Sequence, residues 1–208
     1  MNWTEWLTEN QGERMDAFMP INPRERRTVH ISRYGQAATW ASNLPDVKTI
    51  YDFPCGTGYG SSILAFCGFD VCGFDRDPKA IEYAREFYGK NESIHFDVDD
   101  LVRPKIIDGG ECDCIVCLEG IEHVPTPDIV LKNFADISKR LIISFPHNQG
   151  TGVYHLYNTT LHNMQGMLHD AGYDVLQAAC QGADSIWREI TELNKIDNPC
   201  IMLYSELN

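Results

Sequence analysis

Three side chains near the middle of the chain have the types and spacing of an acid–base or metal-binding group. Glu119, Glu122 and His123 lie at i, i+3 and i+4, which would place them on one face of a helical turn. The imidazole of His123 could remove a proton from a hydroxyl group. Two carboxylates and an imidazole also suit Mg²⁺ or Mn²⁺, with His147 or His155 as a further ligand. A purely structural role for the carboxylates is the third interpretation, and the residues alone leave all three open.

A glycine-rich turn at residues 52–60 (DFPCGTGYG) has the composition of a ligand-binding loop. It follows a short apolar run at 47–51 and precedes a helix-like segment at 61–66. Glycine lets a ligand approach the backbone closely, and a helix that begins at such a turn presents free N–H groups and a partial positive charge. Strand, glycine turn and helix in this order therefore predict a binding site at residues 52–60.

Asp75 ends the next apolar run and could hold the sugar of a ligand bound at this turn. A carboxylate at a strand end can accept two hydrogen bonds from the vicinal hydroxyls of a ribose. Its alternative role is to cap the helix that follows it. The glycine pattern of the turn differs from the GxGxxG of a dinucleotide fold, which disfavours NAD as the ligand.

The chain has the size and composition of one folded domain. It contains 208 residues, of which 43% are hydrophobic and 23% charged. No apolar run approaches the ~20 residues that span a bilayer, and residues 1–10 lack the pattern of a signal peptide. We therefore expect a cytoplasmic protein without a membrane segment, whose cysteines are buried free thiols. The net charge of −13 argues against a broad nucleic-acid surface.

Strand and helix patterns alternate along most of the chain. Residues 1–46 predict a helical extension, irregular up to Pro23 and helical from there to about 43, that forms a flap. Residues 47–208 predict a ligand-binding domain built on a doubly wound, mostly parallel α/β sheet of seven strands, and the two parts form one compact domain. The expected strands are 47–53, 69–74, 93–96, 112–118, 140–145, 173–179 and 200–204, and the expected helices after the extension are 59–67, 78–88, 127–138, 160–171 and 185–195.

The motifs at the strand ends occur in the order and spacing of a known family. Ligands of an open α/β sheet bind at the carboxyl ends of its strands, where this chain has residues 52–60, Phe74-Asp75, 97–101 (DVDDL) and 119–124 (EGIEHV). In series these segments resemble the class I S-adenosylmethionine (SAM)-dependent methyltransferases. The resemblance covers roughly residues 12–180 and includes the segments 12–15 (GERM), 30–34 (HISRY), 146–148 (PHN), 157–158 (YN) and 161–172.

The resemblance implies a role for each of these positions. The glycine turn would face the amino-acid part of SAM, and the acid after the second strand would hold the ribose. The acidic stretch would hold the adenine, and the end of the fourth strand would lie near the sulfonium. Pro54 stands where the family usually has its first glycine, which removes one N–H from the turn. The implied cofactor-binding residues are Asp52, Cys55, Gly56, Gly58, Asp75, Arg76, Asp97, Val98, Leu118 and Arg33, the last as a residue that closes the flap or simply packs its helix.

The activity that the resemblance implies is methyl transfer from SAM to an oxygen or nitrogen of a small-molecule acceptor, leaving S-adenosylhomocysteine (SAH). Catalysis would fall to His123, Glu119 and Glu122, and a Mg²⁺ or Mn²⁺ ion, if used, would be held by these three residues with His155. The alternatives are a metal-assisted RNA 2′-O-methyltransferase and a SAM-binding protein without transferase activity. The acidic charge disfavours a nucleic-acid partner, and the sequence gives no sign of an oligomeric state.

Overall fold

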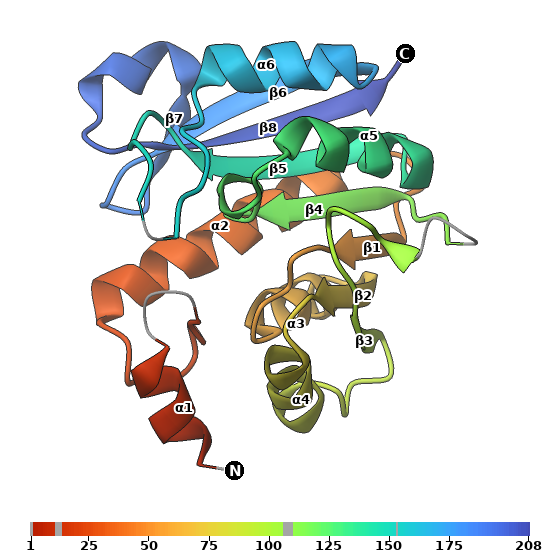
Figure 1. Ribbon diagram of the computed structural model, residues 1–208, viewed down its shortest axis with the longest axis vertical. Helices are drawn as coiled ribbons and strands as arrows, with labels where there is room; N and C mark the ends of the chain where they lie inside the picture. Colours follow the sequence, from red (N-terminus) through yellow and green to blue (C-terminus); the bar gives the residue numbers. More distant parts are fainter. Residues whose placement is uncertain (1, 11–13, 106–109, 153) are drawn as a thin grey trace.

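The computed structural model describes residues 2–10, 14–105, 110–152 and 154–208. At its centre is one eight-stranded sheet (Figure 1). The strand order is β3-β2-β1-β4-β5-β8-β6-β7. Neighbours among the first five are parallel, whereas β8 is antiparallel to β5 and β6, and β7 to β6. The predicted mostly parallel α/β class is confirmed. The strands are β1 (Thr49–Asp52), β2 (Asp70–Asp75), β3 (Ile94–Val98), β4 (Cys114–Leu118), β5 (Arg140–Pro146), β6 (Tyr173–Gln181), β7 (Trp187–Glu189) and β8 (Cys200–Leu207).

Helices cover both faces of the sheet because its central strands are apolar on both sides. Strand β4 is buried along its whole length. Its Cys114, Val116 and Leu118 lie in one core with α2 and α3, while Ile115 and Cys117 lie in another with α5 and α6. Successive side chains of a strand point to opposite faces, so a strand between two helical layers must be apolar throughout. The helices are α1 (Trp3–Glu9), α2 (Arg24–Ser42), α3 (Tyr59–Phe66), α4 (Pro78–Phe87), α5 (Pro127–Ile137) and α6 (Leu161–Asp170), with 3₁₀ turns η2 (Ile121–His123) and η3 (Ile190–Lys195).

The sheet has one strand more than the seven predicted, because residues 187–189 of the helix predicted at 185–195 form a strand and only residues 190–195 are helical, as a 3₁₀ turn. The segment thus forms β7 and η3. The chain turns back just before β7, where the N–H of Ser185 donates to the carbonyl of Gly182 at 3.1 Å. Strand β7 then pairs with β6 in antiparallel register. An open sheet edge offers a row of backbone partners, which outweighs a modest local preference for helix.

The N-terminal segment contains a helix, α1, where irregular chain was predicted. Asn2 caps it by accepting the N–H of Glu5 at 3.3 Å. Trp3 and Trp6 pack on Tyr83 of α4, and their ring centroids lie 5.3 and 5.9 Å, respectively, from the ring centroid of Tyr83. A helix of seven residues is too short to be stable by itself. Burial of the two indole rings therefore fixes α1 against α4.

Helix α2 lies close to α3 because Gly60 leaves room for an aromatic ring between them. A Cβ atom at Gly60 would lie 1.9 Å from the ring of Tyr34. The hydroxyl of Tyr34 donates to Asp52 at 3.1 Å, and Ser61 of α3 donates to the other oxygen of the same carboxyl at 2.6 Å. The buried side chain of Asp52, at the end of β1, thus joins both helices to the sheet.

Within the described residues, none of the helices combines the length and apolar character that a membrane crossing needs. The cysteines are all free thiols, as predicted. Six of the eight are buried, whereas Cys67 is exposed and Cys72 is half-buried.

Two glycine-to-alanine variants test the close approach of α2 and α3. Gly60→Ala should lower the free energy of unfolding by about 1–3 kcal/mol, because the new methyl group overlaps the Tyr34 ring. Gly35→Ala is the matched control within α2, where a Cβ meets nothing within 4 Å, and should raise it by about 0.5–1 kcal/mol. Urea unfolding measures both, and similar effects at the two positions would contradict the packing.

Candidate active site

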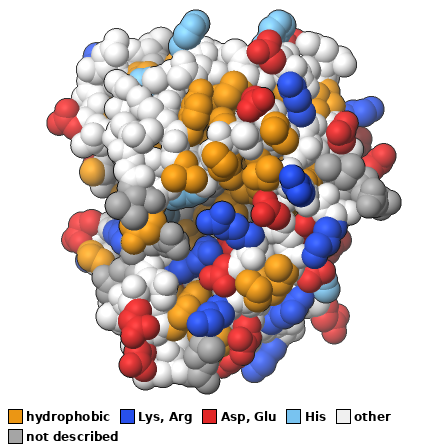
Figure 2. All heavy atoms as spheres, viewed as in Figure 1, with side chains coloured by type: hydrophobic (Ala, Val, Ile, Leu, Met, Phe, Trp, Pro, Cys, Tyr) orange, Lys and Arg blue, Asp and Glu red, His pale blue; other side chains and the backbone are white. Residues whose placement is uncertain are grey.

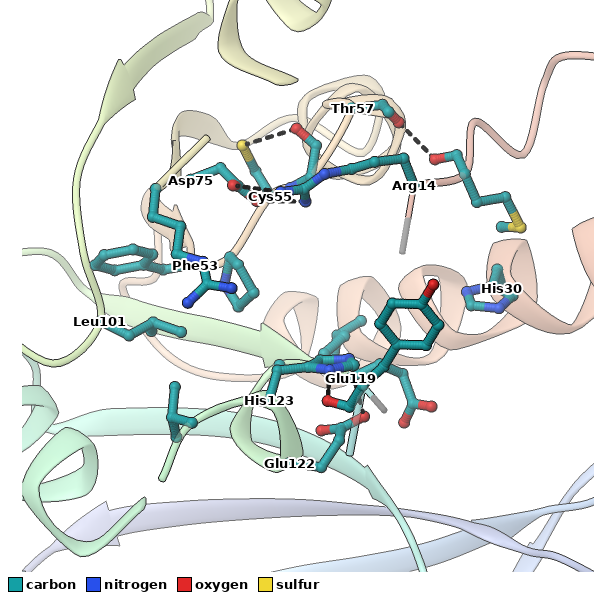
Figure 3. Close-up of a pocket in the computed structure, with 18 of the residues that line it drawn as sticks. Arg14, His30, Phe53, Cys55, Thr57, Asp75, Leu101, Glu119, Glu122 and His123 are labelled. Carbon is teal, nitrogen blue, oxygen red and sulfur yellow. Dashed lines mark hydrogen bonds and ion pairs between the residues drawn. The ribbon is translucent and has the colours of Figure 1, made fainter. Parts of the chain in front are cut away.

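A cavity of about 400 Å³ opens at the carboxyl ends of β1, β2 and β4. In the space-filling view, blue Lys or Arg side chains lie beside a central hollow (Figure 2). Figure 3 shows Asp75, Cys55 and Arg14 on one side of a cavity and Glu119, Glu122 and His123 across from them. The wall is formed by residues 14–15, 53–57, 59, 75–76, 99–102, 118–120, 122–125 and 154–156, together with Arg26, His30, Arg33 and Tyr34 of α2.

The two predicted glycines of the turn have different roles. Gly56 lines the cavity at φ +56°, and a Cβ there would meet nothing within 4 Å, so the backbone is open to a ligand. Gly58, at φ +85°, lies behind the wall. A Cβ there would lie 2.7 Å from Cβ of Ala84 and 2.8 Å from the ring of Phe96. Gly58 therefore allows the turn to pack on α4 and β3, and the predicted ligand contact falls to Gly56 and the adjacent Cys55.

Pro54 lies in the cavity wall with its ring against Gly120. A Cβ at Gly120 would lie 2.3 Å from Cδ of Pro54, so the proline fits because the residue opposite is glycine. The next residue, Cys55, donates its N–H to the carbonyl of Phe74 at 2.8 Å. The turn is therefore fixed to β2 by a backbone bond that does not involve the N–H that proline lacks.

Asp75, the predicted ribose-binding residue, has a buried side chain and lines the cavity. One oxygen accepts the N–H of Gly56 at 3.0 Å, the other accepts the N–H of Asp77 at 2.9 Å, and the side chain of Arg14 contacts both. The alternative role of helix cap falls to Asp77, which accepts the N–H of Lys79 at 2.9 Å. Arg76, also a predicted site residue, lies exposed in the wall.

Asp52 lies behind the turn and outside the cavity wall, contrary to the prediction that it faces the cofactor. Burial raises the pKa of its carboxyl to about 7, although hydrogen bonds from Ser61 and Tyr34 act in the opposite direction. Asp52 therefore positions the turn from behind.

Asp97 and Val98 are also absent from the described cavity wall. Side chains alternate along β3, and Asp97 falls on the outward face, where its carboxylate pairs with Arg85 at 3.2 Å. Asp99 and Asp100 line the cavity in their place. The acidic stretch therefore reaches the cavity, but through residues other than the two predicted.

Glu119 is held as an ionised carboxylate by the helix α2. Arg33 lies 2.9 Å from one oxygen, and Ser144 and Cys200 each donate to the other at 3.2 Å. Burial raises the pKa of Glu119, but the charge of Arg33 and these donors outweigh it, so the pKa lies below its usual range. Arg33 also donates to Gln181 at 3.0 Å. Both predicted residues line the cavity, and they are paired with each other.

Glu122, His123 and His155 form a cluster of acid, base and metal-ligating side chains. One ligand atom from each lies within 4.8 Å of the others. Glu122 is buried, and one of its oxygens has no hydrogen-bond partner. Burial and the charge of Glu119 raise the pKa of the Glu122 carboxyl well above the usual value. His147 is not part of this group, because its Nδ1 accepts the N–H of Leu161 at 3.1 Å.

The orientation of His123 is fixed by a loop. Its Nδ1 lies 2.7 Å from the carbonyl oxygen of Tyr154, which can only accept, so the proton is on Nδ1 and the lone pair is on Nε2. The carbonyl of Glu122 accepts the N–H groups of Leu156 and Tyr157 at 2.8 and 3.1 Å. The loop therefore sets the tautomer that leaves Nε2 as a proton acceptor.

Several wall residues were given no role by the sequence. Arg14 lay in a motif that was recognised, although Gly12 and Glu13 of that motif lie outside the described residues. His30 contacts the hydroxyl of Tyr59 at 3.4 Å, and burial, with the charge of Arg33, lowers its pKa to about 3, so it is neutral. His30 lies one turn of α2 before Arg33, which is the signal that would have found it.

Residues 24–178 match the family described as the methyltransferase domain, and this range covers most of the chain. The chain belongs to this family.

Relatives of this methyltransferase-domain protein include two named O-methyltransferases. The ubiquinone biosynthesis O-methyltransferase of Bordetella pertussis is 31% identical over 139 residues, which cover 64% of this chain and 51% of that protein. The magnesium-protoporphyrin O-methyltransferase of Rhodobacter capsulatus is 33% identical over 112 residues, which cover 50% of this chain and 47% of that one. The chain thus spans about half the length of these relatives.

The fold is shared with a solved methyltransferase. Magnesium protoporphyrin IX methyltransferase from Synechocystis PCC 6803, whose structure contains SAH, superposes with a TM-score of 0.72. The match covers 99% of this chain and 98% of that chain at 19% identity. It establishes a common fold for the whole described chain, including the antiparallel strands at the sheet edge.

The raised pKa of Asp52 predicts a specific pH dependence of stability. Between the ordinary value of 3.8 and about 7, the folded state holds a proton that the unfolded chain has lost, so stability falls as pH rises, by up to ~1.4 kcal/mol per pH unit. Asp52→Asn does not titrate and should lose this part of the slope. Urea unfolding of both proteins from about pH 4 to about pH 8 tests this, and parallel stability curves would count against it.

Proposed function

We propose that this protein is a SAM-dependent methyltransferase that acts on an oxygen or nitrogen of a small-molecule acceptor and releases SAH. The observation that carries the proposal is the arrangement of one cavity between two chemically different walls. A buried carboxylate, Asp75, lies beside the open backbone of Gly56, and the basic Nε2 of His123 lies across from them (Figure 3). One wall suits a nucleoside and the other suits an acceptor that must lose a proton.

The residues on the first wall fit the cofactor. Asp75 offers both carboxylate oxygens to a ribose diol. The open space at Gly56 admits a ligand against the backbone. Asp99 and Asp100 would border the adenine, and Leu118 at the end of β4 would border the sulfonium. Membership of the methyltransferase-domain family and the SAH in the Synechocystis enzyme of the same fold support this assignment.

The protein has few chemical tasks once the cofactor is bound. The sulfonium of SAM supplies an activated methyl group. The cavity walls then align the acceptor with it and exclude water. His123 is placed to remove the acceptor proton at Nε2, because Tyr154 holds the other ring nitrogen. Glu122, a wall residue whose raised pKa favours the protonated carboxyl and which has one unpartnered oxygen, would hydrogen bond to an acceptor heteroatom.

A small acceptor is favoured by the form of the site and by its relatives. The cavity of about 400 Å³ is within the size range of small-molecule sites. The net charge of −13 disfavours an RNA acceptor. The two relatives named above take their names from ubiquinone biosynthesis and from magnesium-protoporphyrin, both of which concern small molecules.

Metal-assisted transfer is the second candidate, and the cluster of Glu122, His123 and His155 favours it. These residues would hold a Mg²⁺ or Mn²⁺ ion, with Glu122 ionised. Such an ion would polarise an acceptor hydroxyl and lower its pKa. Glu119, which the sequence placed among the ligands, is committed to Arg33 at 2.9 Å and lies outside the cluster. A metal site here would thus contain one carboxylate and two imidazoles.

Two aspartates at neighbouring strand ends test the cofactor site. Asp75→Asn should weaken SAM and SAH binding by about 10- to 100-fold, because it removes the charge that strengthens hydrogen bonds from the ribose. Asp97→Asn is the matched control and should change binding by less than about twofold, since Asp97 faces Arg85 outside the cavity. Isothermal titration calorimetry measures both. Equal losses would refute the placement of the ribose, and no binding of either ligand by the wild-type protein would refute the proposed function.

Two histidine variants separate the general base from the metal. His123→Ala should lower turnover about 10²- to 10⁴-fold and leave SAH affinity within about threefold, because the residue lies on the acceptor wall. His155→Ala should reduce turnover only a few-fold if His123 acts as a base without metal. SAH release over a panel of phenols, carboxylic acids and amines measures turnover.

Mn²⁺ titration followed by electron paramagnetic resonance supplies a readout that does not depend on turnover. Binding by the wild-type protein that both His123→Ala and His155→Ala abolish would establish metal-assisted transfer in place of the base mechanism. Loss of SAH affinity alone in His123→Ala would contradict any role on the acceptor side.

A further inference from the structure

The carboxylate of Asp75 has two kinds of partner in this structure. Each oxygen accepts one short backbone bond, from Gly56 at 3.0 Å or from Asp77 at 2.9 Å. Each also receives one longer contact from the guanidinium of Arg14, at 3.3 Å from Nη1 and 3.4 Å from Nη2. The side chains are 15% and 3% exposed, so this ion pair is largely buried. Arg14 therefore occupies the two positions at which the hydroxyls of a ribose would bind.

A ribose diol can replace the guanidinium without leaving Asp75 short of donors. Two O–H donors take the place of two N–H donors, and the short bonds from Gly56 and Asp77 stay as they are. The second contact of Arg14, to Asp77 at 3.3 Å, involves a side chain that is 29% exposed and that water can solvate. The released guanidinium, in contrast, is a charge in a partly buried place, and it needs a new partner.

The backbone beside Arg14 keeps that side chain over the glycine turn. Thr57 donates its hydroxyl to the carbonyl of Met15 at 2.6 Å, and both residues line the cavity. This turn is where the amino-acid part of SAM would lie, with its negatively charged carboxylate. Another arginine in the wall, Arg33, is already bound to Glu119 at 2.9 Å and to Gln181 at 3.0 Å.

We propose that Arg14 is a cofactor-binding residue that exchanges partners, leaving Asp75 when the ribose binds there and pairing with the carboxylate of the cofactor's amino-acid part. This inference rests on the proposed function, since it assigns a contact within the SAM site. It makes Arg14 a selectivity residue for ligands that carry both a ribose and an amino-acid carboxylate. A nucleoside that lacks the carboxylate would displace the guanidinium of Arg14 from Asp75 without supplying a new partner for its charge.

The test compares two ligands in two proteins. SAH carries the ribose and the carboxylate, whereas 5′-methylthioadenosine carries the ribose and the thioether but no amino-acid part. Arg14→Gln should weaken SAH binding by about 10- to 100-fold, because a charge-assisted hydrogen-bonded pair is lost. It should leave 5′-methylthioadenosine binding equal or tighter, because the competitor for Asp75 has gone. Isothermal titration calorimetry gives all four dissociation constants and hence the coupling.

Other variants keep the test decisive. Arg14→Lys retains the charge without the planar fork and should show an intermediate loss that is again confined to SAH. Thermal unfolding shows whether Arg14→Gln folds, and if it does not, Arg14→Lys replaces it in the comparison of the two ligands. Arg24→Gln, at an exposed position outside the cavity wall, should change neither ligand's affinity.

Three outcomes would overturn the exchange. Equal weakening of both ligands would make Arg14 a structural support for Asp75, and an unchanged SAH affinity would show that no contact forms with the carboxylate. Tighter binding of both ligands would make Arg14 only a competitor. All three leave SAH binding by the wild-type protein intact and so are distinct from failure of the proposed function, in which the wild-type protein binds neither SAM nor SAH.

Discussion

The carboxyl group of Asp52 is the contact on which the rest of the site depends. It lies fully buried at the end of β1, where Tyr34 of α2 and Ser61 of α3 both donate to it. Helix α3 continues the glycine turn that forms one wall of the cavity, and α2 brings Arg33 to Glu119 on the opposite wall. One buried acid therefore sets the distance between the two halves of the cavity. Its protonation near neutral pH makes this burial less costly, because a neutral carboxyl loses less solvation than a carboxylate.

The wall at the end of β4 contains two glutamates, three positions apart, whose pKa values shift in opposite directions. Glu119 is ionised because Arg33, Ser144 and Cys200 surround it with positive charge and donors. The pKa of Glu122 is raised well above its usual value, because burial and the charge of Glu119 outweigh the effect of Arg33. Two groups of one chemical type thus acquire opposite pKa shifts from their surroundings alone. Glu119 joins α2 to the end of β4, while Glu122 lies in the cavity wall with one buried oxygen that has no hydrogen-bond partner.

The features that sequence predicted well are those set by local pattern. Continuous apolar runs and glycine turns predicted the sheet, its parallel part and the location of the site, because a strand buried on both faces has no other composition available. The features that the sequence could not predict depend on contacts between residues that are distant in the chain. Asp97 lies within β3 and Asp99 just beyond its end, and an acidic run does not reveal where the strand stops and the chain turns toward the cavity. The segment at 185–195 has helical composition, and only the open edge of β6 makes residues 187–189 a strand. The pairing of Arg14 with Asp75 joins residues that no spacing rule connects.

Residues 154–157 hold η2 and this wall of the cavity through main-chain atoms. His123 is oriented by the carbonyl of Tyr154, and the N–H groups of Leu156 and Tyr157 bind the carbonyl of Glu122. Any amino acid except proline at 156 and 157 supplies the same donors, and any at 154 supplies the same acceptor. The side chains at 154, 156 and 157 are thus free to diverge while the imidazole stays in place. Substitutions at these three positions can reshape this edge of the cavity without moving His123.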